Sequence, residues 1–270
     1  MPKTQAEKAK TFLELHQPGS PFVMPNPWDM GSAKVLEGMG FPALATTSAA
    51  FAFTQGRRDY GLTREQAIAH AGLIAGAVDV PVSGDLENGF GDAPEACAET
   101  VRQAADAGLV GCSIEDYTTN DDDPIYPIDQ AVERVAAAVE TARAQPFHFV
   151  ITARAENFLN GRPDMADTIA RLQAYSTAGA DVLYAPGIWS PDEMATLTAA
   201  VDKPVNALAH PSVSVDQWAA AGVARISLGS WLGRTTQISL VDAAQAIRDD
   251  GSFAKLADPK RFGEVDQHLA

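Results

Sequence analysis

The sequence predicts a closed barrel of eight parallel β-strands, each followed by an α-helix, which is the (β/α)8 fold of the TIM type. Short apolar or β-branched runs alternate with longer helical patterns along the whole chain. The short runs are apolar throughout, which is typical of parallel strands covered on both faces. The length of 270 residues also suits a barrel of this type, which typically needs about 250 residues.

The predicted strands are short, and the stretches between them are long enough for one helix each. The strands are expected at Phe22–Asn26, Ala43–Thr47, Val80–Asp85, Gly111–Glu115, His148–Arg154, Asp181–Ala185, Pro204–Leu208 and Arg225–Leu228. The helices are expected at Met30–Met39, Arg64–Ala77, Ala93–Ala107, Ile128–Ala144, Met165–Ala178, Pro191–Ala200, Val215–Ala221 and Leu232–Arg248.

Several helix ends carry local signals. Thr63 with Gln66 three residues later forms a capping box, and Ser190 before Pro191 offers a cap and a proline at the first helical position. A glycine closes several helices shortly before the next strand, as is common at helix C-termini. These glycines are Gly40, Gly108, Gly179 and Gly222.

An open, doubly wound sheet is the alternative fold. It would require a glycine-rich phosphate turn after the first strand, where this chain reads Pro-Asn-Pro-Trp-Asp over residues 25–29. The closed barrel is therefore favoured, with residues 1–270 as a single domain. Residues 252–270 contain no ninth βα unit, so we expect residues 250–270 to form a helical arm that packs against a neighbouring subunit.

The net charge of −15 argues against binding to nucleic acid or to an anionic membrane surface, because both require a basic surface. No apolar stretch approaches the roughly 20 residues that span a bilayer, and the N-terminus lacks a signal-peptide pattern. Cys97 and Cys112 are expected to be reduced and packed in the core. These features predict a cytoplasmic protein.

Carboxylates follow several predicted strands, at the end of the barrel where parallel barrels hold their active sites. Asp85, Glu87 and Glu115 end strands, and Asp59 lies in the loop after the second strand. Asp85 and Glu87 are two residues apart and therefore face the same side of a strand. Clustered acids repel one another unless a cation joins them, and oxygen ligands without His or Cys favour Mg²⁺, with Mn²⁺ as an alternative. The competing interpretation is that each acid is an exposed loop charge or a helix cap.

Arg154 ends a strongly apolar strand, so it must meet anions there. It is predicted to hold the negative charge of a substrate, for which a guanidinium group suits carboxylate or phosphonate, or else to form a structural ion pair. Thr47, Ser48 and Ala49 follow the second strand and could bind a carboxylate through hydroxyl and backbone N–H groups.

Three further candidates each have an alternative interpretation without a functional role. Trp28 and Tyr60 could wall the pocket or simply pack, and His210 is either an acid/base group or a loop residue. The acidic run at residues 120–123 is predicted to be a solvated loop or a lid.

Four motifs in this order resemble the isocitrate lyase/phosphoenolpyruvate mutase superfamily. They are Arg57-Arg58-Asp59-Tyr60-Gly61, Gly84-Asp85-Leu86-Glu87-Asn88-Gly89-Phe90-Gly91, Ser113-Ile114-Glu115-Asp116 and Thr152-Ala153-Arg154-Ala155-Glu156. The resemblance runs from about Phe22 to Gly233, and it implies a barrel that binds Mg²⁺ and assembles as a homo-oligomer.

The resemblance also implies roles for single residues. Asp85 would ligate Mg²⁺ directly, while Asp59, Glu87 and Glu115 would act mainly through water. The substrate would contact a further set of residues, and these are Trp28, Thr47, Ser48, Ala49, Arg154 and Asn206.

The chain departs from the lyases of this family at two places. The segment Tyr117–Pro124 lacks the lysine, cysteine and histidine of the lyase lid, and Gly187 stands where the lyases have glutamate. The pattern is more similar to members that act as oxaloacetate decarboxylases, phosphonopyruvate hydrolases or lyases of unsettled substrate.

The sequence thus predicts a Mg²⁺-dependent lyase that cleaves the C–C or P–C bond next to the enolisable carbon of a small 2-oxo or 2-hydroxy acid. Arg154 and Glu115 are its catalytic candidates, and water or His210 would supply the proton. Phosphonopyruvate hydrolase or phosphoenolpyruvate mutase chemistry is one alternative. A phosphate-binding barrel that uses Leu228-Gly229-Ser230 is another, and a barrel that binds a 2-oxo acid without turnover is a third.

Overall fold

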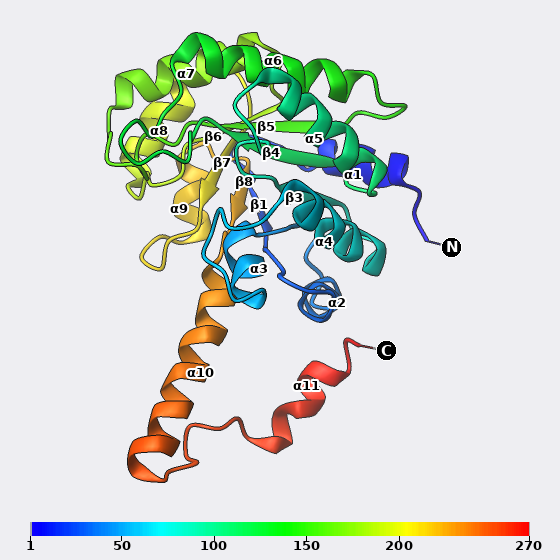
Figure 1. Cartoon of the computed structure of the whole chain (residues 1–270), viewed down its shortest axis with the longest axis vertical. Helices are drawn as coiled ribbons and strands as arrows, with labels where there is room; N and C mark the ends of the chain where they lie inside the picture. Colours follow the sequence, from blue (N-terminus) through cyan, green and yellow to red (C-terminus); the bar gives the residue numbers. More distant parts are fainter. Residues whose placement is uncertain (1, 270) are drawn as a thin grey trace.

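Eight parallel strands form one sheet at the centre of the molecule, with helices around it (Figure 1). The computed structural model describes residues 2–269. The strands neighbour one another in the order β1-β8-β7-β6-β5-β4-β3-β2, which confirms the predicted (β/α)8 barrel. Their bounds are β1 Phe22–Met24, β2 Leu44–Ala45, β3 Val82–Asp85, β4 Gly111–Glu115, β5 Val150–Arg154, β6 Val182–Tyr184, β7 Val205–Leu208 and β8 Arg225–Ser227.

Single hydrogen bonds close the barrel between β1 and β2. The N–H of Ala45 donates to the carbonyl of Pro25 at 3.1 Å. The buried Asn26 adds a second link, because its Nδ2 donates to the carbonyl of Thr46 at 2.8 Å while its Oδ1 accepts from the N–H of Leu228 at 2.9 Å. Asn26 thereby connects the carboxyl ends of three neighbouring strand segments, those of β1, β2 and β8.

Each of the eight predicted helices is present, and all but the last, α10, lie around the sheet. Their bounds are α2 Met30–Gly38, α4 Arg64–Ala77, α5 Pro94–Asp106, α6 Ile128–Arg143, α7 Met165–Thr177, α8 Pro191–Ala200, α9 Val215–Ala220 and α10 Trp231–Asp250. The predicted caps also form, since Thr63 accepts from the N–H of Gln66 and Ser190 from that of Glu193.

The strands are shorter than predicted where prolines interrupt them. β1 ends at Met24, before Pro25 and Pro27, and β3 begins at Val82, after Pro81. Proline has no N–H to give to a ladder, so apolar composition alone overestimates the paired length.

An additional helix, α1 (Gln5–Glu14), covers the amino end of the barrel. Its Ala9 and Phe12 are buried in a cluster with Phe22, Val150 and other residues of the strands. No helix was predicted for this segment, although Thr4 and Glu7 form a capping box there.

The C-terminal part extends away from the barrel. Within α10 only Gly233 is buried, and the chain after it returns alongside through a 3-10 turn, Pro259–Arg261, and α11 (Phe262–Asp266) (Figure 1). This is a helical arm in the predicted position, and its last residue, Ala270, lies outside the described residues.

The state of the two cysteines and the absence of a membrane-spanning pattern were also predicted from the sequence. Cys97 and Cys112 are free and buried, as predicted. Within residues 2–269, no helix combines the length and the apolar character needed to cross a membrane. The short helix α3 (Ser48–Thr54), which is not among the eight predicted helices, follows β2.

Candidate active site

Two of the predicted acids and Arg154 lie on three neighbouring strands at the carboxyl end of the barrel. Asp85, Glu115 and Arg154 end β3, β4 and β5 respectively, and the register pairs Glu115 directly with Arg154. Because side chains alternate along a strand, Glu115 points toward the barrel axis while the next residue, Asp116, turns outward. Asp116 is held there by Arg171 and Tyr175.

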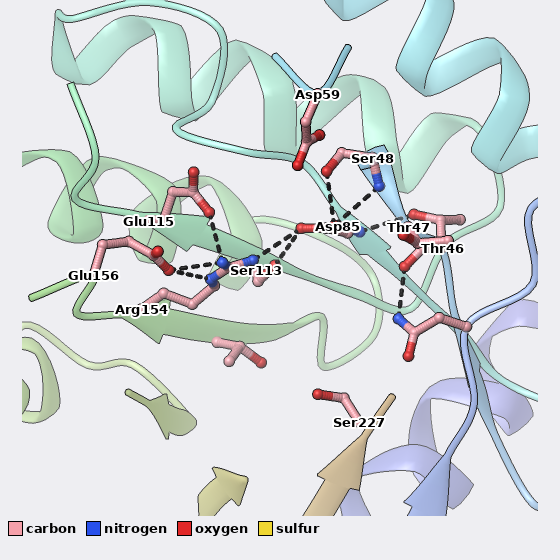
Figure 2. A network of polar contacts seen from close by, with 12 residues as sticks. Thr46, Thr47, Ser48, Asp59, Asp85, Ser113, Glu115, Arg154, Glu156 and Ser227 are labelled. Atoms are coloured by element: carbon pink, nitrogen blue, oxygen red, sulfur yellow. Dashed lines mark hydrogen bonds and ion pairs between the residues drawn. The ribbon is translucent and has the colours of Figure 1, made fainter. Parts of the chain in front are cut away.

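Arg154 is the centre of the polar network (Figure 2). Its guanidinium contacts Asp85 at 3.1 Å, Glu115 at 3.0 Å and Glu156 at 2.7 Å. Its Cζ atom also lies 5.1 Å from the ring centre of Tyr184. Burial alone would lower the pKa of Arg154, but Glu115, Glu156 and Asp85 together raise it well above its usual value. The arginine is therefore a fixed positive charge in this cavity.

Asp85 is anchored on its other side by the start of α3. Its Oδ2 accepts from the N–H of Ser48 at 3.0 Å and from the Ser48 hydroxyl at 3.1 Å. The N–H of Asp85 donates to the hydroxyl of Thr46 at 2.9 Å, and Thr47 caps α3. The loop after β2 thus positions the carboxylate at the end of β3.

Glu115 is almost fully buried and has a partner for each carboxylate oxygen. The Tyr60 hydroxyl donates to Oε1 at 2.6 Å, and Arg154 contacts Oε2. Burial raises the pKa of Glu115 well above its usual value, against the attraction of Arg154. Burial likewise raises the pKa of Glu156. Both carboxyl groups therefore depend on nearby positive charge to remain ionised.

Asp59 and Glu87 add two more acids beside Asp85. Burial and then Asp85 raise the pKa of Asp59. Burial, Asp85 and Asp59 raise the pKa of Glu87 to about 8. Glu87 has a left-handed backbone, with φ of 49°, which is unusual for a residue with a side chain and is frequent near functional sites.

A cavity of about 120 Å³ opens beside this network. Seven of the predicted residues line it, and these are Thr47, Ser48, Ala49, Asp59, Asp85, Glu115 and Arg154. Tyr60, Leu159, Tyr184, Pro186, Leu208, Gly229 and Ser230 complete the wall. The cavity is small and polar at one side and apolar at the other, as suits a compact acid.

Four other predicted residues lie elsewhere. Glu87 lines a separate chamber behind Tyr60, and Trp28 lines a groove between α2, α10 and the C-terminal tail. His210 is not among the residues that line the cavity, and its Nδ1 lies 2.7 Å from the Ser212 hydroxyl.

Asn206 is fully buried beneath the cavity, and both ends of its amide are engaged. Its Oδ1 accepts from Arg225 at 2.8 Å, and its Nδ2 donates to the Ser227 hydroxyl at 2.9 Å. It lines a small void of about 40 Å³ together with Asp85, Arg154 and Arg225. Substrate contact by Asn206 stays a prediction.

The sequence analysis assigned no role to Glu156 or Tyr184 and gave Tyr60 only a wall role. Glu156 had a usable signal, because its spacing of two from Arg154 places both side chains on the same face, as with Asp85 and Glu87. Tyr184 had no such signal, because it lies in a short apolar strand in which aromatic residues are common.

The donor set fits a divalent cation of the Mg²⁺ type. Five carboxyl groups (Asp59, Asp85, Glu87, Glu115 and Glu156) are gathered around one arginine, and four of them have raised pKa values. Among residues 2–269, no three His, Cys, Asp or Glu side chains are grouped closely enough to bind one ion directly. Carboxylate oxygens are the ligands that Mg²⁺ prefers, and Mg²⁺ usually keeps part of its water shell in proteins.

A family model described as phosphoenolpyruvate phosphomutase matches residues 12–248 of this chain. The chain belongs to the isocitrate lyase/phosphoenolpyruvate mutase superfamily. Members with named activities among its relatives include 2-methylisocitrate lyases, an oxaloacetate decarboxylase and a phosphonopyruvate hydrolase.

Three relatives illustrate how this superfamily member compares with others. A solved structure from Burkholderia cenocepacia J2315, provisionally named a lyase/mutase, is 50% identical with a TM-score of 0.93, covering 98% of this chain and 96% of that one. An uncharacterized protein of Mycobacterium tuberculosis (strain H37Rv) is 34% identical over 88% of this chain and 89% of its own length. A phosphonopyruvate hydrolase, solved with oxalate and Mg²⁺, shares the fold at 22% identity and a TM-score of 0.83, covering 99% of this chain and 96% of that chain.

Proposed function

We propose that this protein is a Mg²⁺-dependent lyase that cleaves the bond next to the enolisable carbon of a small 2-oxo acid such as oxaloacetate, or of a related 2-hydroxy acid. The observation that carries the proposal is a buried arginine, Arg154, held by three carboxylates at the wall of a cavity of about 120 Å³. The excess of acids calls for a cation, and the arginine offers a site for a substrate anion.

Each side of the cavity has a part in this chemistry. Mg²⁺, or Mn²⁺ in its place, held by Asp85 with Asp59, Glu87 and Glu115 acting through water, would stabilise negative charge that develops on the C2 oxygen. Arg154 would hold the substrate's distal anionic group or the departing fragment. Thr47, Ser48 and Ala49 would bind the carboxylate beside the keto group through hydroxyl and backbone N–H groups.

Glu115 and Glu156 act on the substrate through Arg154. They fix the direction of its guanidinium, so that the group need not reorganise during the reaction. Leu159, Pro186 and Leu208 exclude water from the opposite wall, which strengthens each electrostatic contact. Since His210 does not line the cavity, water is the simpler source of the proton for C3.

Gly187 stands where the lyases of this family have glutamate. It has φ of 93°, and a Cβ atom there would lie 2.9 Å from the Cβ of Phe158. A glutamate like that of the lyases could not occupy this position without a shift of the backbone. The chain therefore lacks a side chain that the lyases have at this position, which favours a reaction other than that of isocitrate lyase.

Turnover tests this proposal against its alternatives. We expect Mg²⁺-dependent conversion of oxaloacetate, abolished by EDTA, in a panel that also contains phosphonopyruvate, isocitrate and 2-methylisocitrate, with products identified by NMR. Preferred cleavage of phosphonopyruvate would instead establish P–C chemistry. Binding without any turnover would establish a non-catalytic barrel, and metal-independent turnover of a sugar phosphate would establish the phosphate-binding alternative.

We also propose that the protein acts as a homo-oligomer in which α10 packs against a second copy of this chain. Ten large apolar residues between Trp231 and Leu269 are exposed, and these are Trp231, Ile238, Leu240, Val241, Ile247, Phe253, Leu256, Phe262, Val265 and Leu269. A patch of this kind usually marks a protein interface. Light scattering should give a multiple of the 28.5 kDa chain mass, and Ile238→Asp combined with Val241→Asp should give the monomer. A monomeric wild-type protein would refute this proposal.

A further inference from the structure

Tyr60 forms part of the boundary between the substrate cavity and solvent. It lines the cavity, and yet 36% of its surface is exposed. Its hydroxyl donates to Oε1 of Glu115 at 2.6 Å, and Glu115 is only 3% exposed. The side chain therefore runs from the surface of the molecule to the buried acids. It closes the cavity where the other carboxylate oxygen of Glu115 contacts Arg154.

The backbone of Tyr60 has a conformation that suits glycine better than tyrosine. Its φ of 59° is left-handed, which glycine adopts freely and a residue with a side chain adopts at a cost. The turn itself does not require the aromatic ring, because its hydrogen bonds run from the N–H of Gly61 to the carbonyl of Arg58 and from Arg57 to the carbonyl of Gly61. Strained residues persist where their side chains have a function. The function of Tyr60 therefore lies in its side chain.

Two contacts hold the ring of Tyr60 in one position. One is the hydrogen bond to Glu115, and the other is an edge contact with the ring of Tyr117, at 4.9 Å between the ring centres and 61° between the planes. Tyr117 is itself held, because its hydroxyl donates to Asp121 at 3.0 Å and its backbone bridges to Ile125. A ring held at its tip and along its side does not turn away easily when a ligand presses against it.

We propose that Tyr60 limits the length of the substrate beyond C3. The inference rests on the proposed function, in which Arg154 holds the distal end of the substrate. A tail that extends past Arg154 would meet the Tyr60 ring, so the intact protein accepts only short 2-oxo acids. Without the ring, the same tail could continue into the separate chamber that Tyr60 lines on its other side.

Leu159 is the alternative candidate for this role. It also lines the cavity, and it is 48% exposed. Its side chain has no polar group that could anchor it, so it can change rotamer to make room for a ligand. Tyr60, with its anchored hydroxyl, is the more rigid of the two barriers.

A series of 2-oxo acids with unbranched alkyl tails tests the proposal, because an uncharged tail reports space and not charge. The series is pyruvate, 2-oxobutyrate, 2-oxopentanoate and 2-oxohexanoate, which share one head group and grow by one methylene. Their affinities can be measured in the presence of Mg²⁺ by calorimetric competition against oxalate, which is too short to have a tail. The variants are Tyr60→Gly, which suits the left-handed backbone, Tyr60→Phe, which keeps the ring, and Leu159→Ala.

We expect the wild type to lose affinity by about tenfold or more at one step of the series, since a single methylene can have this effect in a closed pocket. Tyr60→Phe and Leu159→Ala should show the loss at the same step. In Tyr60→Gly the affinity should not fall through 2-oxohexanoate. Oxalate should bind equally to the wild type and to both Tyr60 variants.

Several results would overturn the proposal. These are a wild type without such a step, a Tyr60→Gly variant with the same step as the wild type, or a Tyr60→Phe variant that behaves like Tyr60→Gly. Disappearance of the step in Leu159→Ala alone would assign the limit to Leu159. Loss of oxalate binding in Tyr60→Gly alone would place Tyr60 at the head group and not at the tail.

Failure of the proposed function gives a different result. If oxalate does not bind the wild-type protein in the presence of Mg²⁺, the metal-dependent site for 2-oxo acids is refuted. If oxalate binds and only the dependence on tail length is absent, the proposed lyase stands and the role of Tyr60 is refuted.

Discussion

Two buried arginines in the same barrel have opposite surroundings. Arg154, near the carboxyl end, contacts Asp85, Glu115 and Glu156. Arg225 on β8 contacts only the neutral partners Asn206, Thr152 and His16, at 2.8, 3.0 and 3.2 Å.

The contrast shows how charged and neutral groups are distributed inside the barrel. Burial lowers the pKa of Arg225 to about 9, whereas the acids raise that of Arg154 well above its usual value. Inside the barrel, Arg225 is surrounded by neutral hydrogen-bond partners, whereas Arg154 at the carboxyl end is surrounded by carboxyl groups. A buried arginine indicates a reactive site here only where carboxylates accompany it.

His16 illustrates how the amino end remains neutral. Its Nδ1 lies 2.8 Å from the carbonyl of Phe12 and its Nε2 lies 3.2 Å from Nη1 of Arg225. A carbonyl can only accept and a guanidinium can only donate, so the proton is on Nδ1 and Nε2 is the acceptor. Burial and then Arg225 lower the pKa of His16 to about 3.

The largest expected effect is on stability. Arg154→Met leaves three carboxylates without their cation and should lower the free energy of unfolding by about 3–5 kcal/mol at pH 8. Arg225→Met leaves only neutral acceptors unpaired and should cost about 1–3 kcal/mol. Urea unfolding measures both. The Arg154→Met loss should shrink at acidic pH, where the freed carboxyl groups take up protons, and equal losses at both positions would contradict the comparison.

Activity should distinguish Arg154 from an arginine outside the site. Arg154→Lys replaces a planar fork by a single ammonium, and kcat/KM should fall by roughly 10²–10³-fold, as for loss of one aligned donor at a reacting oxygen. Arg248→Lys changes an exposed arginine paired with Asp249 and should leave kcat/KM unchanged. A similar decrease in both variants would remove Arg154 from the site.

The raised pKa of Glu87 predicts how cation binding depends on pH. The folded pKa is about 8 and the ordinary value 4.5, so between these values the fold holds a proton that the unfolded chain would release. A cation must displace this proton, and the affinity for Mg²⁺ should rise about tenfold per pH unit up to about pH 8 and then level off. Calorimetry in buffers of different ionisation enthalpy should detect one released proton, absent in Glu87→Gln and present in the control Glu65→Gln.

The pKa of His16, at the other end of the barrel, is shifted downward and not upward as for Glu87. Its protonation should have a smaller effect, which is on the stability of the fold. Its folded pKa of about 3 lies below the usual 6.5, so its contribution to stability is complete above pH 6.5 and is lost as the pH falls toward 3. The slope is at most about 1.4 kcal/mol per pH unit. His16→Gln, which can also accept from Arg225, should remove this slope between pH 6.5 and 4.5, while the more exposed His148→Gln should keep it.

Much of the fold could be predicted because the barrel repeats one pattern of apolar strand and capped helix. The strand ends could not, since Pro25 and Pro81 stop pairing in runs that remain apolar. α1 was missed although Thr4 and Glu7 give a local capping-box signal, because the burial of Phe12 depends on strands far along the chain.

The candidate site was predicted to the extent that strand ends converge in a parallel barrel. Asp59, Asp85, Glu115 and Arg154 were brought together because each lies at or near such an end. Loop residues were harder to place. Glu87 continues β3 by number, but its left-handed backbone turns it into the neighbouring chamber, and no strand periodicity describes such a turn.

Arg64 and Arg134 donate hydrogen bonds to the backbone carbonyls of the loop at residues 88–92, and this loop bears on how the protein could change its chemistry over evolutionary time. Its carbonyls are committed to distant helices, so insertions or replacements there should be rejected by selection. The neighbouring turn from Thr118 to Asp123 is mostly exposed and is joined at its base by a single bridge between Tyr117 and Ile125. Directed evolution toward a new substrate should therefore accumulate its changes in the turn and leave the held loop untouched.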